Sequence, residues 1–313
     1  GDKIGIDDAS VLLYPCDGYG NPELLRDVIK KENIDALFLI TDPRYFEWLF
    51  QMEHEVRSSI PIAYLNIWDD LPAPMYNREF YDSCDALFGI SKQTVNINKL
   101  VLGKEKSKEK IIKYIPHGLN NQTFRPLKDD DSGLMETKKK INNGVDVDFT
   151  LLFNSRNIRR KSIPDTILAW KFFMDTLTKE EQKKCNFILH TDPVSDAGTD
   201  LLAVINFLFP ETGSGNLVIS QQKLTRDQLN QFYNIADGVI LLSSAEGWGL
   251  SLTEALLTGT PIIANVTGGM QDQMRFEDKN GNWIDFDENI PSNHRGTYKT
   301  HGEWAFPVYP TSL

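Results

Sequence analysis

The chain has 313 residues, enough for two domains of about 150 residues each. Its 41% hydrophobic and 25% charged residues are typical of a globular protein, and no apolar run reaches the roughly 18 residues of a membrane span. The formal net charge of −11 argues against general nucleic-acid binding, because contacts with phosphate dominate that affinity.

The three cysteines are Cys16, Cys84 and Cys185. They show neither Cys-x-x-Cys nor Cys/His spacing, which argues against a disulfide framework and against a zinc site. No signal peptide is visible. These features favour a reducing compartment, and we expect a cytoplasmic protein.

Short apolar runs alternate with helix-like segments through the first part of the chain. The predicted strands are residues 11–14, 36–40, 62–67, 86–90 and 111–115, and the predicted helices are residues 22–32, 44–55, 76–83 and 92–102. This alternation predicts a parallel sheet with helices on both faces. We therefore assign residues 1–125 to a first, Rossmann-like domain.

The alternation stops between residues 126 and 147, which we interpret as an interdomain linker with at most one short helix. This stretch contains Asp129, Asp130 and Asp131, followed by three lysines. Three adjacent aspartates are compatible with a metal site or with a solvated run of charge, and the composition favours the solvated run.

The alternation restarts in residues 148–313, which we assign to a second domain. Its predicted strands are residues 149–154, 186–191, 217–220, 238–242 and 261–264, and its predicted helices are residues 163–177, 201–209, 226–236 and 249–257. The fold class is therefore α/β, with two doubly wound domains. Ligands of such sheets bind at the carboxyl ends of the strands, which predicts a cleft between the domains. Residues 277–313 show no assignable element.

Residues 243–256 (SSAEGWGLSLTEAL) follow a predicted strand and open a predicted helix. Gly247 and Gly249 allow a tight turn, and the first N–H groups of the helix form an anion site that suits a diphosphate. Glu246 and Glu254 flank this site, where they can accept hydrogen bonds from sugar and ribose hydroxyls. The alternative is an ordinary strand, loop and helix with surface glutamates.

Residues 154–161 (NSRNIRRK) also follow a strand and place four basic residues within six positions. A departing nucleoside diphosphate needs cations where its charge develops. The alternative is a solvated basic turn.

The order of these motifs resembles that of the retaining glycosyltransferases of family 4, which have the GT-B fold. The likeness covers residues 111–274 and rests on 115–118 (IPHG) with 124–126 (FRP), 155–162 (SRNIRRKS), 233–237 (YNIAD), the pair Glu246 and Glu254, 259–261 (GTP) and 268–269 (GG). Each piece alone is weak, and the set is specific.

The resemblance implies roles for individual residues. Arg156 and Lys161 would bind the donor diphosphate, and Glu254 would bind the ribose. The donor sugar and phosphate would lie against Glu246 and the backbone of Gly247, Trp248, Gly249 and Leu250. Members of the family typically need no metal and retain the anomeric configuration, with the departing phosphate taking the proton of the acceptor.

The chain departs from the family pattern in several places. Residues 17–21 are a poor match to the family's glycine-rich loop, and no closing helix is evident, so we expect both ends to lack family elements. Many members of the family carry a histidine in the first domain near the donor sugar. In this chain Asp69 either replaces that histidine or is a helix cap or surface residue. His117 either reaches the cleft from the hinge or is structural. Trp283 and Trp304 either form an acceptor platform or fix the tail to the core.

We therefore predict transfer of a hexose from a nucleoside-diphosphate sugar to a glycan, lipid or other hydroxyl acceptor, with retention and without a metal or other cofactor. The alternatives are a non-catalytic nucleotide-sugar or glycan-binding protein, which has no need of leaving-group cations, and an epimerase of the same fold, for which no acid/base set is evident. A dinucleotide-dependent oxidoreductase is disfavoured because neither domain opens with G-x-G-x-x-G. The sequence specifies neither the acceptor nor the base and sugar of the donor.

Overall fold

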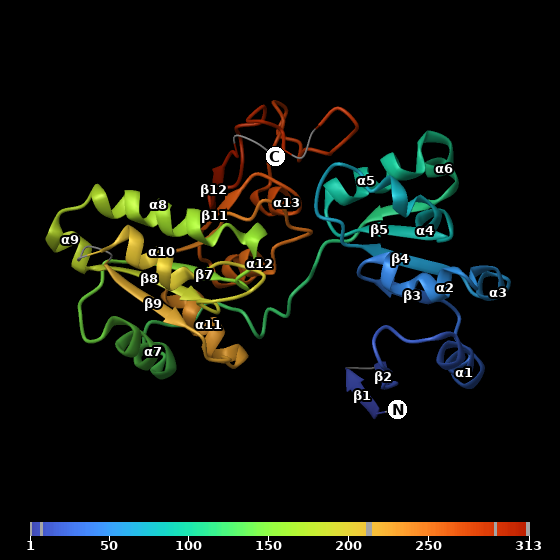
Figure 1. The fold of residues 1–313 in the computed structure, drawn as a ribbon, viewed down its shortest axis with the longest axis horizontal. Coiled ribbons are helices and arrows are strands. Elements are labelled where there is room, and N and C mark those ends of the chain that lie inside the picture. Colours follow the sequence, from blue (N-terminus) through green and yellow to red (C-terminus); the bar gives the residue numbers. More distant parts are fainter. Residues whose placement is uncertain (1, 7–8, 211–214, 291–292, 311–313) are drawn as a thin grey trace.

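The computed structural model describes residues 2–6, 9–210, 215–290 and 293–310. Two α/β domains lie side by side, each built around a parallel sheet (Figure 1). This arrangement confirms the predicted fold class. A hairpin of β1 (Asp2–Ile6) and β2 (Ala9–Leu13) precedes them. The prediction that residues 11–14 join the first parallel sheet is wrong, because β2 pairs with β1 in antiparallel register.

The sheet of the first domain has the order β3-β4-β5-β6, and all its neighbours are parallel. Its strands are β3 (Leu37–Ile40), β4 (Ile62–Asn66), β5 (Ala86–Gly89) and β6 (Ile111–Tyr114). Its helices are α1 (Pro22–Glu32), η1 (Pro43–Phe46), α2 (Glu47–Phe50), α3 (Glu53–Arg57), η2 (Met75–Asn77), α4 (Arg78–Asp82), α5 (Lys92–Leu102) and α6 (Lys104–Glu109). The single helix predicted for residues 44–55 is wrong, because the backbone leaves helical geometry at Phe46 and again at Met52.

The second domain contains a six-stranded parallel sheet with the order β12-β11-β10-β7-β8-β9. Its strands are β7 (Phe149–Asn154), β8 (Cys185–His190), β9 (Asn216–Ser220), β10 (Gly238–Leu241), β11 (Ile262–Asn265) and β12 (Ala305–Val308). The associated helices are η3 (Arg159–Lys161), α8 (Ile163–Asp175), α9 (Lys179–Lys183), α10 (Leu201–Leu208), α11 (Arg226–Ile235), α12 (Leu250–Thr258) and α13 (Met270–Met274). The sequence analysis did not predict α9, α13 or β12.

Continuous apolar runs explain why the central strands are buried. Residues 151–153 of β7 and 187–189 of β8 are at most 5% exposed, as expected for parallel strands covered on both faces. Trp170 of α8 packs on Phe187 with a centroid distance of 5.1 Å. Side chains of this kind make one core beneath the helices, and the strand ends therefore hold fixed positions.

The segment between the sheets is anchored to α11. The N–H groups of Arg125 and Leu127 donate to the side chains of Asn230 and Asn234, at 3.0 and 2.7 Å. Helix α7 (Ser132–Asn142) follows in the same segment and packs on α11. Asp131 caps this helix by accepting from the N–H of Leu134, so one of the three adjacent aspartates has a structural function.

The tail fixes the second domain to α5 of the first. The ammonium group of Lys92 lies 3.8 Å from the ring centroid of Trp283 and donates to the carbonyl of Ile284 at 2.7 Å. The indole of Trp304 donates to the carbonyl of Gln273 at 3.0 Å, and β12 extends the sheet beside β11. These contacts favour the interpretation of both tryptophans as residues that fix the tail.

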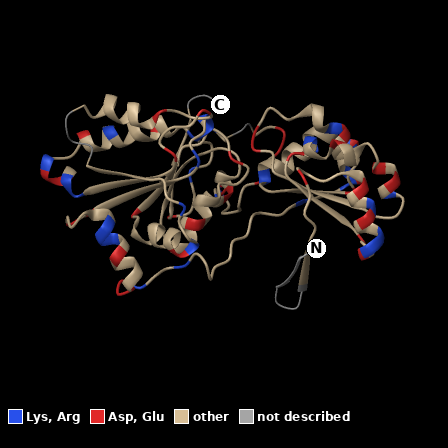
Figure 2. Cartoon of the chain, turned by 60° about the horizontal axis from the view of Figure 1, so that its bottom comes forward, with Lys and Arg blue, Asp and Glu red and all other residues tan. Residues whose placement is uncertain are grey.

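Figure 2 shows acidic and basic side chains interspersed along the outer helices of both domains. Across residues 2–6, 9–210, 215–290 and 293–310, no helix has both the length and the apolar character that a bilayer span requires. Those same residues contain no group of three or more His, Cys, Asp or Glu side chains placed to hold a metal ion.

Candidate active site

A cavity of about 700 Å³ lies where the carboxyl ends of the two sheets meet. The first domain lines it with residues that follow β4, β5 and β6, namely Ile67, Asp69, Ile90 and His117. The second domain lines it with the loops after β7, β8, β9 and β10. Parallel sheets place ligands at this edge, so the topology predicts a binding site here.

The loop after β10 brings the domains into close contact. A Cβ atom on Gly247 would lie 2.7 Å from the carbonyl oxygen of Ile67, so only glycine fits between them. Gly249 has a φ of +89° and starts α12, whose N-terminus has no side-chain cap. Gly249, Leu250 and Ser251 line the cavity. The N-terminus of α12 is therefore a site for an anion.

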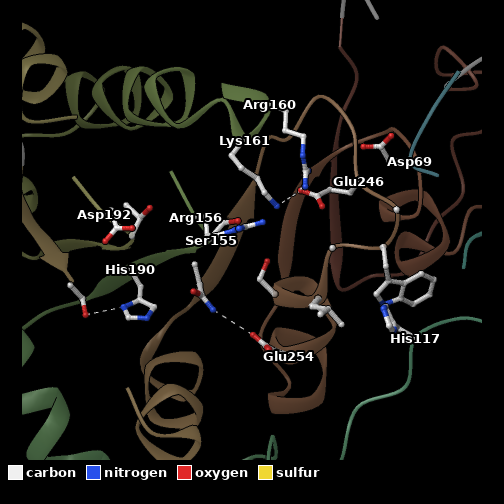
Figure 3. A pocket seen from close by; sticks show the side chains of 18 of the residues that line it. Asp69, His117, Ser155, Arg156, Arg160, Lys161, His190, Asp192, Glu246 and Glu254 are labelled. Carbon is white, nitrogen blue, oxygen red and sulfur yellow. Dashed lines mark hydrogen bonds and ion pairs between the residues drawn. The ribbon is translucent and has the colours of Figure 1, made fainter. Parts of the chain in front are cut away.

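Two cations of the basic loop pair with one carboxylate (Figure 3). Lys161 is 8% exposed, Glu246 is 6% exposed, and their side chains form an ion pair. A guanidinium nitrogen of Arg160 lies 2.8 Å from the same carboxylate oxygen. Burial lowers the pKa of Lys161, and the charge of Glu246 opposes that shift. The cluster keeps a net positive charge beside the anion site.

Arg156 lies on the same side of the cavity as Lys161 and is exposed. Within the described part of the chain, no carboxylate forms an ion pair with its guanidinium group. Ser162, which follows Lys161, has a φ of +48° and lies directly before α8. The basic loop therefore supplies the cavity with Arg156, which has no carboxylate partner among the described residues, and with two cations, Arg160 and Lys161, that share Glu246.

Glu254 points into the cavity from α12. It accepts a short hydrogen bond from the hydroxyl of Tyr233, and the amide nitrogen of Asn154 lies 3.5 Å away. Asn154 also donates to the hydroxyl of Tyr233 at 2.8 Å. Burial raises the pKa of Glu254, and the Tyr233 hydrogen bond opposes the shift. The carboxylate is thus held in place, with capacity to accept further hydrogen bonds from hydroxyl groups.

Trp248, Asp69 and His117, the other residues predicted for the donor site, also line the cavity. Trp248 is 9% exposed and donates from its indole to Thr253 at 2.8 Å. Asp69 and His117 approach from the first domain (Figure 3). Burial lowers the pKa of His117, so its imidazole is neutral near pH 7. All the predicted site residues therefore lie around one cavity.

Sequence reasoning missed the side chains after β8 and β9. His190 ends β8, lines the cavity, and has its Nδ1 atom 3.0 Å from the hydroxyl of Ser220. Burial lowers the pKa of His190, which favours the neutral imidazole. Asp192 and Gln221 lie in the same part of the wall. These three residues could have been found from the sequence, because each lies at or just after the end of a predicted strand.

Comparisons with known proteins find similarity to glycosyltransferases in part of the chain. Residues 201–292 match the model described as "Glycosyl transferases group 1". An uncharacterized glycosyltransferase of Methanocaldococcus jannaschii is 31% identical over 83 residues, which cover 26% of this chain and 21% of that protein.

Several solved structures are similar to this chain. Sucrose-phosphate synthase from Thermosynechococcus elongatus has a TM-score of 0.60 and 17% identity over 80% of this chain and 61% of its own. Anabaena HepE, in complex with UDP and glucose, has a TM-score of 0.59 and 15% identity over 82% of this chain and 67% of its own. The α,α-trehalose 6-phosphate synthase of Burkholderia multivorans has a TM-score of 0.59 and 11% identity over 79% of this chain and 59% of its own. These likenesses establish the two-domain GT-B fold.

Proposed function

We propose that the chain transfers a hexose from a nucleoside-diphosphate sugar to a hydroxyl acceptor, with retention of configuration and without a metal. The observation that carries this proposal is the convergence of Arg156, Lys161 and the uncapped N-terminus of α12 on one cavity between the sheets. The match of residues 201–292 to group 1 glycosyl transferases supports it. So does the structure of the similar HepE protein, which holds UDP and glucose.

The cations and the helix terminus suit the departing diphosphate. Negative charge develops on the phosphate oxygen as the bond to the sugar breaks, and fixed positive groups aimed at that point lower the barrier. Arg156 is uncommitted, and Lys161 can share its charge between Glu246 and a phosphate. Backbone N–H groups at the start of α12 add to the same field.

The two glutamates suit hydroxyl groups on either side of the diphosphate. Glu254, held by Tyr233, would accept hydrogen bonds from the ribose. Glu246 lies on the loop opposite Asp69, and the sugar ring would occupy the space between them (Figure 3). The sugar would thus lie next to the wall that the first domain provides.

The proposed reaction proceeds on one face of the sugar. The bond from C1 to the phosphate oxygen breaks, and the acceptor oxygen bonds to C1 on the same face. The acceptor proton passes to the departing phosphate. The order of the family 4 motifs supports this course.

A thermal-shift panel of UDP-, GDP-, ADP- and TDP-glucose tests the donor site. A ligand at about 100 times its Kd should add about 2.7 kcal/mol to the free energy of unfolding. Arg156→Ala should remove most of this effect, whereas Arg159→Ala should keep it, because Arg159 belongs to the same loop but does not line the cavity. If none of the four compounds shifts the transition, the proposal is wrong.

A further inference from the structure

Two loops leave the carboxyl edge of the first sheet, and the cavity lies at that same edge. The loop after β4 begins with Ile67 and Trp68, places Asp69 in the cavity wall and continues to Tyr76 in η2. The loop after β3 carries Tyr45 in η1. Because β3 and β4 are parallel neighbours, both loops lie at the edge that faces the donor site.

Aromatic side chains of these two loops lie next to one another, and Tyr19, from the segment between β2 and α1, joins them. Trp68 and Tyr76 meet edge to face with centroids 6.0 Å apart, and the guanidinium carbon of Arg44 lies 5.9 Å from the centroid of Tyr76. Next to Arg44, Tyr45 stacks on Tyr19 with centroids 4.2 Å apart and an interplanar angle of 10°. We call these four aromatic residues the aromatic track.

The tyrosines of the track are open to solvent although they are large. Tyr76 is 63% exposed, Tyr45 is 52% exposed and Tyr19 is 47% exposed. Aromatic side chains dominate interface energetics, so two exposed rings at one sheet edge, with Tyr19 stacked on one of them, indicate a surface that binds a ligand. The polar groups between them are Arg44 and Asp42, which pair with each other and leave no net charge.

The loop that carries Tyr45 has a strained backbone. Thr41 has a φ of +98°, which is rare and unfavourable for a β-branched residue. The hydroxyl of Tyr64 donates to the carbonyl of Thr41 at 2.7 Å, and the N–H of Arg44 donates to Asp42 at 3.0 Å. The fold therefore holds this loop in an unfavourable backbone conformation. Strained backbone of this kind is common where a loop takes part in binding.

We propose that the aromatic track binds the inner sugar rings of an oligosaccharide acceptor whose terminal hydroxyl enters the cavity beside Asp69. This inference rests on the proposed function. The C–H face of a pyranose ring carries partial positive charge and packs on the negative face of an aromatic ring. Arg44 and Asp42 lie where they can bond ring hydroxyls, and their neutral pair offers no excess charge to a phosphorylated acceptor.

The aromatic track would make the affinity for an acceptor depend on the number of its sugar units. Tyr76 contacts Trp68, which adjoins the cavity residues Ile67 and Asp69, and Tyr45 and Tyr19 follow after Arg44. An acceptor of one sugar unit would use the cavity alone. Longer acceptors would gain affinity from each ring that reaches a tyrosine of the track.

A glycan array of linear glucans, mannans, galactans and chitooligosaccharides, probed with labelled protein in saturating UDP, tests this proposal. The chain should bind tetrasaccharides of one series at least about tenfold more tightly than the monosaccharide of that series, which corresponds to about 1.4 kcal/mol. Tyr45→Ala and Tyr76→Ala should each remove most of this gain. Tyr45→Phe should keep it, because the ring face remains.

The control variant is Phe207→Ala, which removes an aromatic ring that is 83% exposed on α10 of the other domain. It should leave glycan binding unchanged, and none of the four variants should change the Kd for UDP in calorimetry. UDP binding without any length-dependent glycan binding overturns the acceptor track and leaves the proposed donor site intact. Tyrosine-dependent binding to phosphatidylcholine vesicles instead of glycans also overturns it, because the track would then serve a lipid surface.

Discussion

Glu246→Gln should destabilise the chain and at the same time tighten the binding of free UDP. Glu246 is the anion that Lys161 and Arg160 share, and it is 6% exposed. Without the charge of Glu246, the cations Lys161 and Arg160 lie side by side with no anion between them, and Arg156 lies in the same wall of the cavity. The substitution keeps the size of the side chain, so the effect reports the charge.

The burial of the pair and Coulomb's law together give the expected magnitude of the two effects. Removing one partner of a buried pair costs about 3–5 kcal/mol, and we expect about 3 kcal/mol because the side chain of Arg160 is 38% exposed. A diphosphate charge about 6 Å from a carboxylate is repelled by about 3 kcal/mol at an effective dielectric constant of about 20. Even half of that repulsion, once removed, makes UDP binding about tenfold tighter.

Urea denaturation with and without UDP, together with calorimetry at constant ionic strength, measures both quantities. The matched control is Glu180→Gln, which breaks a surface pair with Lys183 and should cost at most about 1 kcal/mol. With the intact donor, Glu246→Gln should lower kcat, because Glu246 also faces the sugar. A loss of UDP affinity in Glu246→Gln would refute the charge argument. It would mean that Glu246 either contacts the diphosphate directly or holds the loop in its binding conformation.

Three further predictions concern the ribose, pH and metals. Glu254→Gln should weaken UDP about tenfold to a hundredfold in calorimetry, since bonds to a charged acceptor contribute about 1.5–3 kcal/mol; an unchanged Kd would contradict the ribose assignment. Burial raises the pKa of Asp272 from 3.8 to about 7, so the folded chain keeps a proton that the unfolded chain loses. The free energy of unfolding should therefore fall between those pH values, by up to about 1.4 kcal/mol per pH unit, and Asp272→Asn should flatten that slope in urea titrations; an unaltered slope would assign the effect to another group. Sugar transfer should survive EDTA, because the basic loop supplies the cations; loss restored by Mn²⁺ would contradict this.

The sequence by itself determined the local features of this protein. Alternating apolar runs and helical segments predicted the strands β3 to β11, because each pattern reflects burial along a few residues. Gly247 and Gly249 marked the turn into α12, and the cluster from Arg156 to Lys161 marked the loop after β7. These signals are short-range, and the side chains they identified line the observed cavity.

The tertiary structure decided which groups meet. Lys161 and Glu246 are 85 positions apart, and their pairing depends on β7 and β10 being neighbours in the sheet. His190 reaches the cavity because β8 ends at the same edge, and Tyr45 and Tyr76 lie along one track because β3 and β4 are adjacent. Sequence periodicity records burial within a segment, whereas strand order is set by packing between segments that are distant in the chain.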